Sequence, residues 1–160
     1  MKVIGFGAAL VDKQFLIKDD ALIDLGIEKG LMTLNSEEEQ NELLTFLKGE
    51  NYDQISSCGG SATNSIYAAA ALGTSSGFIG KVAQDEDGEI YNSDLKNNNV
   101  EISNCITSSI GKTGNCIVLI TPDAERTMNT YLGVSSETKF SEINFEKPSS
   151  ADLLFMEAYV

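Results

Sequence analysis

The segment from residue 52 to residue 73 constrains the fold most, because it joins a strand pattern to a helix pattern through two consecutive glycines. Residues 52–57 alternate polar and apolar side chains, which is typical of a strand. An alanine-rich helix is expected over residues 65–72, and Gly73 would end it. Gly59 and Gly60 allow a tight turn between the two elements. A strand, a glycine turn and a closely packed helix indicate a layered α/β structure.

The remaining chain repeats this alternation, which places it in the α/β fold class. A helix is expected to begin after Ser36, with Glu39 at the capping-box position and Gly49 ending it. A further helix is expected over residues 85–96. Other segments have strand or turn patterns: strands over 2–6, 14–17, 31–34, 76–82 and 100–102, antiparallel strands over 105–110, 115–121 and 126–131, a turn-rich acidic stretch over 18–30, and a buried parallel strand over 152–156.

Composition limits the partners that the chain can have. Its 160 residues, 42% of them hydrophobic, are enough for one globular domain. A net charge of −13 repels phosphate backbones and anionic lipid, so neither nucleic acid nor a membrane is an expected partner. There is no histidine, and the three cysteines lack metal-ligand spacing, so we expect small buried thiols and no metal site. Without a secretion signal, a cytoplasmic location is expected.

Two polar segments are candidates for binding hydroxyl groups. Gly60 lets the backbone approach a ligand, the first N–H groups of the following helix lack helical partners, and Asn64 can donate and accept hydrogen bonds together. The carboxylate of Asp12 can accept two hydrogen bonds at once, which suits a vicinal diol. Each segment has an ordinary alternative, a plain strand-to-helix turn and a surface aspartate. From the residues alone, both alternatives stay open.

These segments resemble motifs of the ribokinase, or PfkB, family of sugar and nucleoside kinases. Residues 59–72, a Gly-Gly pair followed by Asn64 and an alanine-rich helix, resemble the first signature of the family. Residues 80–88 look like the G-x-V-G-x-D-x-x-G segment that follows it, although Ala83 stands where a glycine is usual. Residues 5–12 are similar to the opening strand, glycine and aspartate of the family. The motifs occur in family order.

Two further features are similar to adenosine-kinase-like members of the family. Residues 122–133 resemble a segment common in these members, where it forms a hairpin turn and a strand. Leu10 stands where ribokinases proper have an asparagine, which favours an adenosine-kinase-like chain. The acceptor implied by the resemblance is therefore a nucleoside related to adenosine, with ribose, fructose or another sugar as the alternative.

The resemblance implies a ribokinase-like fold, a three-layer α/β/α core with a small β lid, truncated at its C-terminal side. Residues 1–160 would be the N-terminal part of a single kinase domain, with lid strands inserted within about 13–34 and 105–131. Residues that would contact the acceptor follow from the matching positions: Asp12, Gly59, Gly60, Ser61, Asn64, Cys116 and Glu157, with Tyr159 and Val160 as apolar contacts.

The implied activity is ATP-dependent phosphorylation of a hydroxymethyl group, with Mg²⁺ bridging the ATP phosphates. The catalytic aspartate of the family lies in a D-T-x-G-A-G-D motif that does not occur in these residues, so no catalytic or metal-binding residue is expected before Val160. ATP and Mg²⁺ would be bound mainly by the missing half, and the chain alone is expected to be inactive. The alternative is a stand-alone binding module derived from the fold. A homodimer through the lid strands is also an option.

Overall fold

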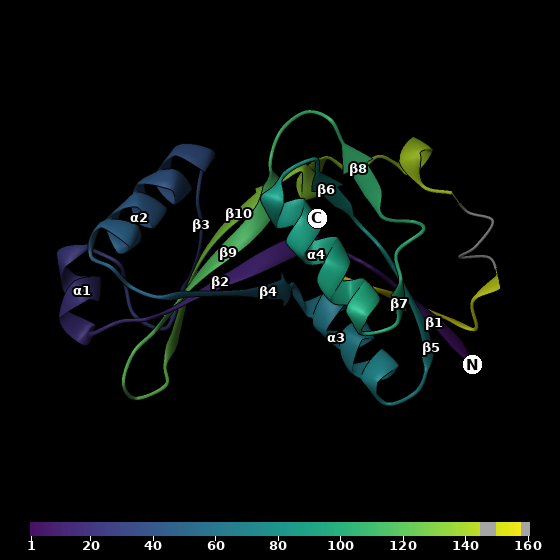
Figure 1. Cartoon of the computed structure of the whole chain (residues 1–160), viewed down its shortest axis with the longest axis horizontal. Coiled ribbons are helices and arrows are strands. Elements are labelled where there is room, and N and C mark those ends of the chain that lie inside the picture. Colours follow the sequence, from purple (N-terminus) through teal and green to yellow (C-terminus); the bar gives the residue numbers. More distant parts are fainter. Residues whose placement is uncertain (145–149, 158–160) are drawn as a thin grey trace. The chain divides into compact units, whose positions relative to one another are not determined.

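A computed structural model describes residues 1–144 and 150–157 of the chain (Figure 1). The chain forms two compact units, and each is described by itself. Unit 1 comprises Met1–Val11, Ser57–Gly114 and Leu132–Val160, and unit 2 comprises Asp12–Ser56 and Asn115–Tyr131. Across the described ranges, every helix is too short or too polar to cross a bilayer.

Unit 1 contains a four-stranded sheet whose pairs are all parallel. The strand order is β11-β1-β5-β7, with β1 (Lys2–Phe6) between β5 (Ser75–Ile79) and β11 (Leu153–Met156), and β7 (Val100–Glu101) at the far edge. In this register Phe6 faces Ile79 on one side and Met156 on the other. The parallel pairing expected for residues 152–156 is confirmed.

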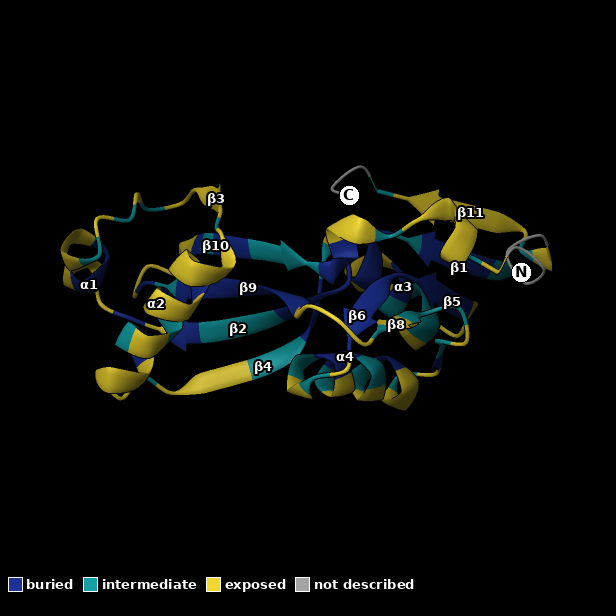
Figure 2. Ribbon diagram, turned by 90° about the horizontal axis from the view of Figure 1, so that it is seen from above, coloured by how far each residue is buried: buried dark blue, intermediate teal, exposed yellow. Residues whose placement is uncertain are grey.

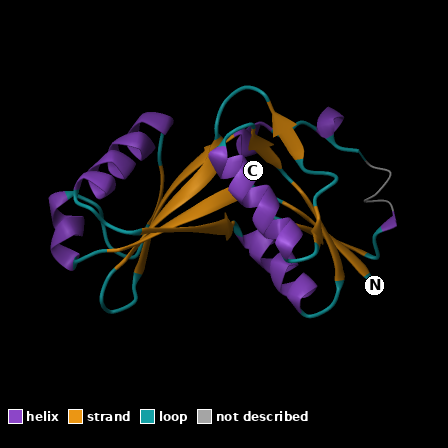
Figure 3. Ribbon diagram, in the orientation of Figure 1, coloured by secondary structure: helices purple, strands orange, loops and turns teal. Residues whose placement is uncertain are grey.

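Two helices complete the core of unit 1 (Figure 3). Helix α3 (Ser61–Ala71) contributes Ala62 and Ile66, and helix α4 (Glu86–Asn97) contributes Tyr91 and Leu95, to a cluster that includes Phe78 of β5. Asp85 caps α4 by accepting a hydrogen bond from the backbone N–H of Gly88 at 2.9 Å. Two short 3₁₀ helices, η1 (Val134–Glu137) and η2 (Phe140–Glu142), follow later in the chain.

Two strand expectations in unit 1 are wrong. The strand expected over residues 76–82 is divided into β5 and β6 (Lys81–Ala83). Gly80 lies between them, at a position where a Cβ would come within 2.6 Å of the Phe78 ring. Strand β6 pairs in parallel with β8 (Ile106–Ser108), so residues 105–110 are not part of an antiparallel set with the later strands.

Unit 2 is built on a five-stranded sheet with the order β3-β10-β9-β2-β4. A tight turn joins two of its strands, since the N–H of Thr121 donates to the carbonyl of Glu125 at 3.1 Å. The short strand β3 pairs in parallel with β10, with Thr33 opposite Asn129. The strands of this sheet are β2 (Leu10–Leu16), β3 (Met32–Leu34), β4 (Gln54–Gly59), β9 (Thr113–Ile120) and β10 (Arg126–Gly133).

Helices α1 (Asp19–Asp24) and α2 (Glu37–Gly49) cover one face of this sheet (Figure 2). Their buried side chains, among them Leu22, Leu43 and Leu47, pack against Phe15 of β2 and Ile117 of β9. The capping box expected at the start of α2 is confirmed, because Ser36 and Glu39 exchange side-chain and backbone hydrogen bonds. Helix α1 lies inside the stretch over residues 18–30 that was expected to be rich in turns.

Two further differences affect the candidate site. Helix α3 begins at Ser61, directly after Gly60, rather than at residue 65. Strand β11 lies at the edge of its sheet, and its side chains are 39% to 63% exposed although they were expected to be buried. An apolar run predicts a strand correctly, but its burial depends on what covers the sheet.

Candidate functional site

In unit 1 the predicted site residues gather where β4 ends and α3 begins. The backbone of Gly60 has φ +93°, and a Cβ at this position would lie 2.7 Å from the carbonyl oxygen of Ala8. Both facts make a side chain here unfavourable, because the left-handed region is costly for L-residues and a backbone oxygen cannot move away easily. Glycine at position 60 is therefore a structural requirement for the close approach of the two segments.

The N-terminus of α3 is capped by a carboxylate from far along the chain. Gly60 offers no side chain, and the first turn of α3 contains no acidic residue. Glu157 takes this role: its Oε2 accepts from the backbone N–H of Ala62 at 2.6 Å, and its Oε1 accepts from the hydroxyl of Ser61. An anion in this position is stabilised by the helix dipole. One N–H group that was expected to be free is thus occupied by the chain itself.

Glu157 reaches α3 because of the sheet register. It directly follows β11, its own N–H donates to the carbonyl of Phe6 at 3.1 Å, and Gly7 leaves room for its side chain. The carboxyl edge of a parallel sheet is where α/β proteins bind ligands. The structure therefore brings Ser61 and Glu157 into contact at this edge, with Gly59 and Gly60 in the adjoining turn.

Asn64 lies in the first turn of α3, where its backbone N–H donates to the carbonyl of Gly60 at 2.9 Å. The residue is exposed, so its side-chain amide can meet a ligand. Its neighbour Thr63 points into the core instead and shares a 2.7 Å hydrogen bond with the buried hydroxyl of Tyr91. This buried hydrogen bond fixes which side of α3 faces the core and which side, with Asn64, faces outward.

In unit 2, Asp12 lies on the face of the sheet opposite to the helices. It is three positions from Phe15 on the same strand, and side chains alternate along a strand, so the two point to opposite faces. Asp12 is partly buried, and this desolvation raises the pKa of its carboxyl above the usual value. The guanidinium of Arg126 opposes this shift through its positive charge.

Cys116 shares this face of the sheet with Asp12. The hydroxyl of Thr130 donates to the Sγ of Cys116 at 3.3 Å, and the charges of Asp12 and Arg126 both act on the thiol. Burial raises the pKa of Cys116 to about 11, so it stays a neutral thiol near pH 7. Arg126 and Thr130 belong to this group as well, although they were not among the predicted site residues. The alternation of strand β10, which places residues 126, 128 and 130 on one face, was the available signal.

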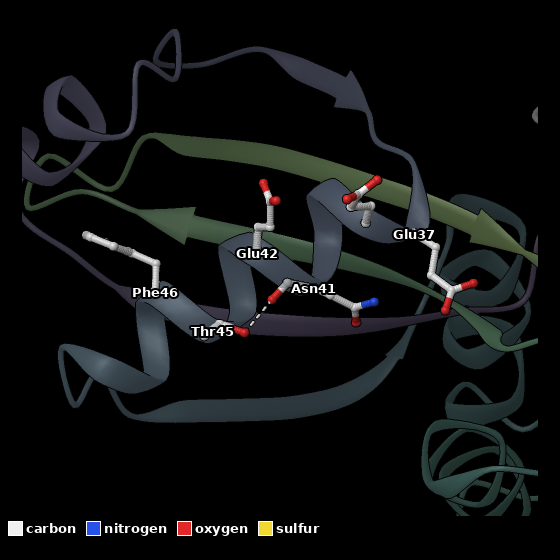
Figure 4. Close-up of a pocket in the computed structure, with 6 residues that line it drawn as sticks. Glu37, Asn41, Glu42, Thr45 and Phe46 are labelled. Carbon is white, nitrogen blue, oxygen red and sulfur yellow. Dashed lines mark hydrogen bonds between the residues drawn. The ribbon is translucent and has the colours of Figure 1, made fainter.

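The hollow drawn in Figure 4 is not part of either group. It lies along the surface of α2, and its lining residues all belong to that helix, including Glu37, Asn41, Thr45 and Phe46. Asn41 and Thr45 face away from the buried side chains of α2, and the hydroxyl of Thr45 donates to the carbonyl of Asn41 at 2.7 Å. A surface formed by a single helix cannot enclose a ligand, so no function follows from it.

Within residues 1–144 and 150–157, no three side chains of the His, Cys, Asp and Glu types come together as metal ligands. Tyr159 and Val160, which were expected to contact the acceptor, lie outside the described residues.

Comparisons with known proteins agree with the fold. An adenosine kinase from Sinorhizobium meliloti superimposes with a TM-score of 0.84 and 30% identity, over 99% of this chain and 47% of that one. A probable sugar kinase from Rhizobium etli CFN 42 gives a TM-score of 0.86 at 30% identity, with the same coverage. These matches confirm the ribokinase-like α/β fold, and this chain spans about half the length of those solved structures.

Sequence comparisons point to the same family. Fructokinase-2 from Zea mays is 33% identical over 88 residues, which cover 55% of this chain and 26% of that protein. Residues 36–160 match the family described as pfkB family carbohydrate kinase. This match extends over most of the chain and includes the turn before α3. The chain therefore belongs to the pfkB family of carbohydrate kinases.

Proposed function

We propose that this chain is the N-terminal, acceptor-binding part of an ATP-dependent kinase that phosphorylates a hydroxymethyl group of a nucleoside related to adenosine, or of a sugar. Family membership supports the kinase class. The similar proteins include adenosine kinases, a probable sugar kinase and a fructokinase, all of which act on hydroxyl-rich acceptors by their names. The match to the kinase family does not favour a stand-alone binding module.

The main support for this proposal is the environment of the Asp12 carboxylate. Among the described residues, no hydrogen bond reaches its carboxylate, and desolvation raises its pKa. A partly buried carboxylate without donors is costly, whereas the two hydroxyls of a vicinal diol would supply two donors at once. Arg126 keeps the charged form available for this contact. The carboxylate of Asp12 would thus bind the ring hydroxyls of the acceptor.

The other proposed contacts have different roles. Asn64 is exposed and can exchange two hydrogen bonds with a hydroxyl group, while Gly59 and Gly60 let the backbone approach the ligand. Ser61 is held by Glu157, so these two residues would shape the acceptor site rather than bind by free groups. Cys116, a neutral and buried thiol, would limit the size of what binds beside Asp12.

Unit 2 would act as the lid of the kinase. Its sheet carries Asp12 and Cys116 on the face that lacks helices, and its own hydrophobic core on the other face. A lid that excludes water protects phosphoryl transfer from hydrolysis. The catalytic base and the residues that bind ATP and Mg²⁺ would come from beyond Val160, so the chain contributes positioning rather than chemistry.

A thermal-shift series tests the acceptor assignment. A ligand that binds only the native state raises the melting temperature by mass action, so adenosine should stabilise the chain more than ribose or fructose at equal concentration. Asp20→Asn, an exposed substitution on α1, serves as a control that keeps this response. Stabilisation by fructose but not by adenosine would show that the acceptor is a sugar, and no stabilisation by any of them would contradict acceptor binding.

A further inference from the structure

Unit 2 contains a second hollow on the face of the sheet that α1 and α2 cover. Its volume is about 610 Å³, within the usual range for small-molecule sites. One wall is a face of α2 that includes Leu43 and Phe46, and another is the segment after α1 with Leu25, Ile27 and Leu31. These apolar side chains come from separate elements, so they surround a space, unlike the single-helix surface of Figure 4.

Asn129 of β10 lines the same hollow. It is 4% exposed, and its Nδ2 has no hydrogen-bond partner among the described residues. The polar groups around it are satisfied: Nε2 of Gln40 donates to the Oδ1 of Asn115 at 2.8 Å and to the carbonyl of Asn129 at 3.0 Å. A buried donor without an acceptor is unfavourable, so a molecule in the hollow that offered this amide an acceptor would gain binding energy.

The charged residues of the hollow define the sign of that molecule. Three carboxylates line it, those of Glu28, Glu39 and Glu42, and the lining includes no lysine or arginine. Glu39 is already engaged, since it accepts from the backbone N–H of Ser36 at 2.7 Å, and this contact lowers its pKa. Glu28 and Glu42 are exposed at the surface, where they can attract a cation.

We propose that this hollow binds a small organic cation, an amine with an apolar body and one oxygen acceptor. The apolar body would lie against Leu31, Leu43 and Phe46, the oxygen would accept from the Nδ2 of Asn129, and the ammonium group would lie near Glu28 and Glu42. This site is separate from the Asp12 face, because Asn129 and Thr130 are consecutive on β10 and point to opposite faces of the sheet. The hollow is therefore distinct from the proposed acceptor site.

Matched probes test the three recognition elements in the ¹⁵N-labelled full chain by NMR. Tyramine carries the amine, the ring and an oxygen acceptor; phenethylamine lacks the oxygen; 4-hydroxyphenylacetate replaces the amine by a carboxylate. Tyramine should shift the side-chain amide signals of Asn129 and bind roughly tenfold more tightly than phenethylamine, the effect of one hydrogen bond. The acid should cause no saturable shift. Equal binding of all three probes, or no shift at Asn129, would overturn the proposal.

Two variants separate the site from the stability of the fold. Asn129→Leu removes the unpaired donor, so the melting temperature should rise by about 2–4 °C while tyramine loses its advantage over phenethylamine. An unchanged or lower melting temperature together with unchanged tyramine binding would contradict the proposal. The double variant Glu28→Gln/Glu42→Gln keeps the buried residues and should weaken tyramine several-fold. Asp12→Asn should leave tyramine binding unchanged, and a loss there would show that the probe binds at the acceptor face instead.

Discussion

Glu157 in unit 1 and Asp12 in unit 2 are both carboxylates at predicted site positions, but their surroundings differ. Glu157 accepts hydrogen bonds from the backbone of Ala62 and from the hydroxyl of Ser61, at the start of a helix whose dipole favours an anion. Asp12 is partly buried, has only the charge of Arg126 to compensate it, and its pKa is raised by desolvation. The first carboxylate has hydrogen-bond donors from the chain itself, whereas no hydrogen bond among the described residues reaches the second.

This difference teaches that two carboxylates at predicted site positions can have opposite consequences for stability. A satisfied carboxylate contributes to folding and loses that contribution when it is removed, whereas a desolvated carboxylate opposes folding until a ligand supplies donors. The turn at Gly59 and Gly60 contributes to folding as Glu157 does, because it allows two backbone segments to approach closely. Substitutions in the two units should therefore differ in which measurement they change.

The largest effect is expected at the turn in unit 1. Gly60→Ala should lower the free energy of unfolding by about 3 kcal/mol, because the new Cβ meets the Ala8 carbonyl oxygen in a left-handed backbone conformation. Gly73→Ala is the matched control: its φ is +87° but nothing lies within 4 Å of the added Cβ, so the cost should be about 1 kcal/mol. Urea denaturation measures both, and equal losses would show that the close approach at Gly60 does not matter.

A smaller loss is expected when the cap of α3 is removed. Glu157→Ala should lower the free energy of unfolding by about 1–2 kcal/mol, since the Ala62 N–H and the Ser61 hydroxyl lose their acceptor. Asp53→Ala removes an exposed carboxylate in the loop before β4 and serves as the control. If both variants lost the same stability, the cap would have no special role.

The smallest effect concerns the pH dependence of stability. Because the folded-state pKa of Asp12 lies above its unfolded value near 3.8, the folded chain binds more protons in the interval between the two pKa values. The contribution of Asp12 to stability therefore falls as the pH rises through that interval. Asp12→Asn should remove this decline without lowering the stability near pH 7, in contrast to Glu157→Ala. Denaturation curves from pH 3 to 7 test this, and a variant less stable than wild type at pH 7 would contradict it.

Much of the fold could be predicted because its signals are local. The capping box of Ser36 and Glu39 lies within four residues, and the strand and helix around Gly59 and Gly60 follow from consecutive residues. Predictions failed for features that depend on contacts between residues far apart in the sequence. Helix α1 has only six residues and is held by packing of Leu22 in the core of unit 2, and the exposure of β11 depends on its position at a sheet edge.

The candidate site divides in the same way. The positions of Asp12 and Asn64 followed from motifs, and family resemblance singled them out from ordinary turn and surface residues. The contact of Glu157 with Ala62 joins residues 95 positions apart, and no local pattern contains it. Predicting that Asp12, Cys116 and Arg126 lie together would have required the order of three strands in the sheet. Sequence motifs indicated candidate residues, while the tertiary structure determines whether their polar groups are already hydrogen-bonded within the chain.

The most direct test of the account is the affinity of the chain for adenosine, measured by isothermal titration calorimetry for wild type, Asp12→Asn and the control Asp20→Asn. If the carboxylate of Asp12 holds the ribose hydroxyls, Asp12→Asn should weaken binding about ten- to a hundredfold, because hydrogen bonds to a charged group are lost. Asp20→Asn should bind like wild type. Equal affinity of all three chains would contradict the central claim that Asp12 is the acceptor contact.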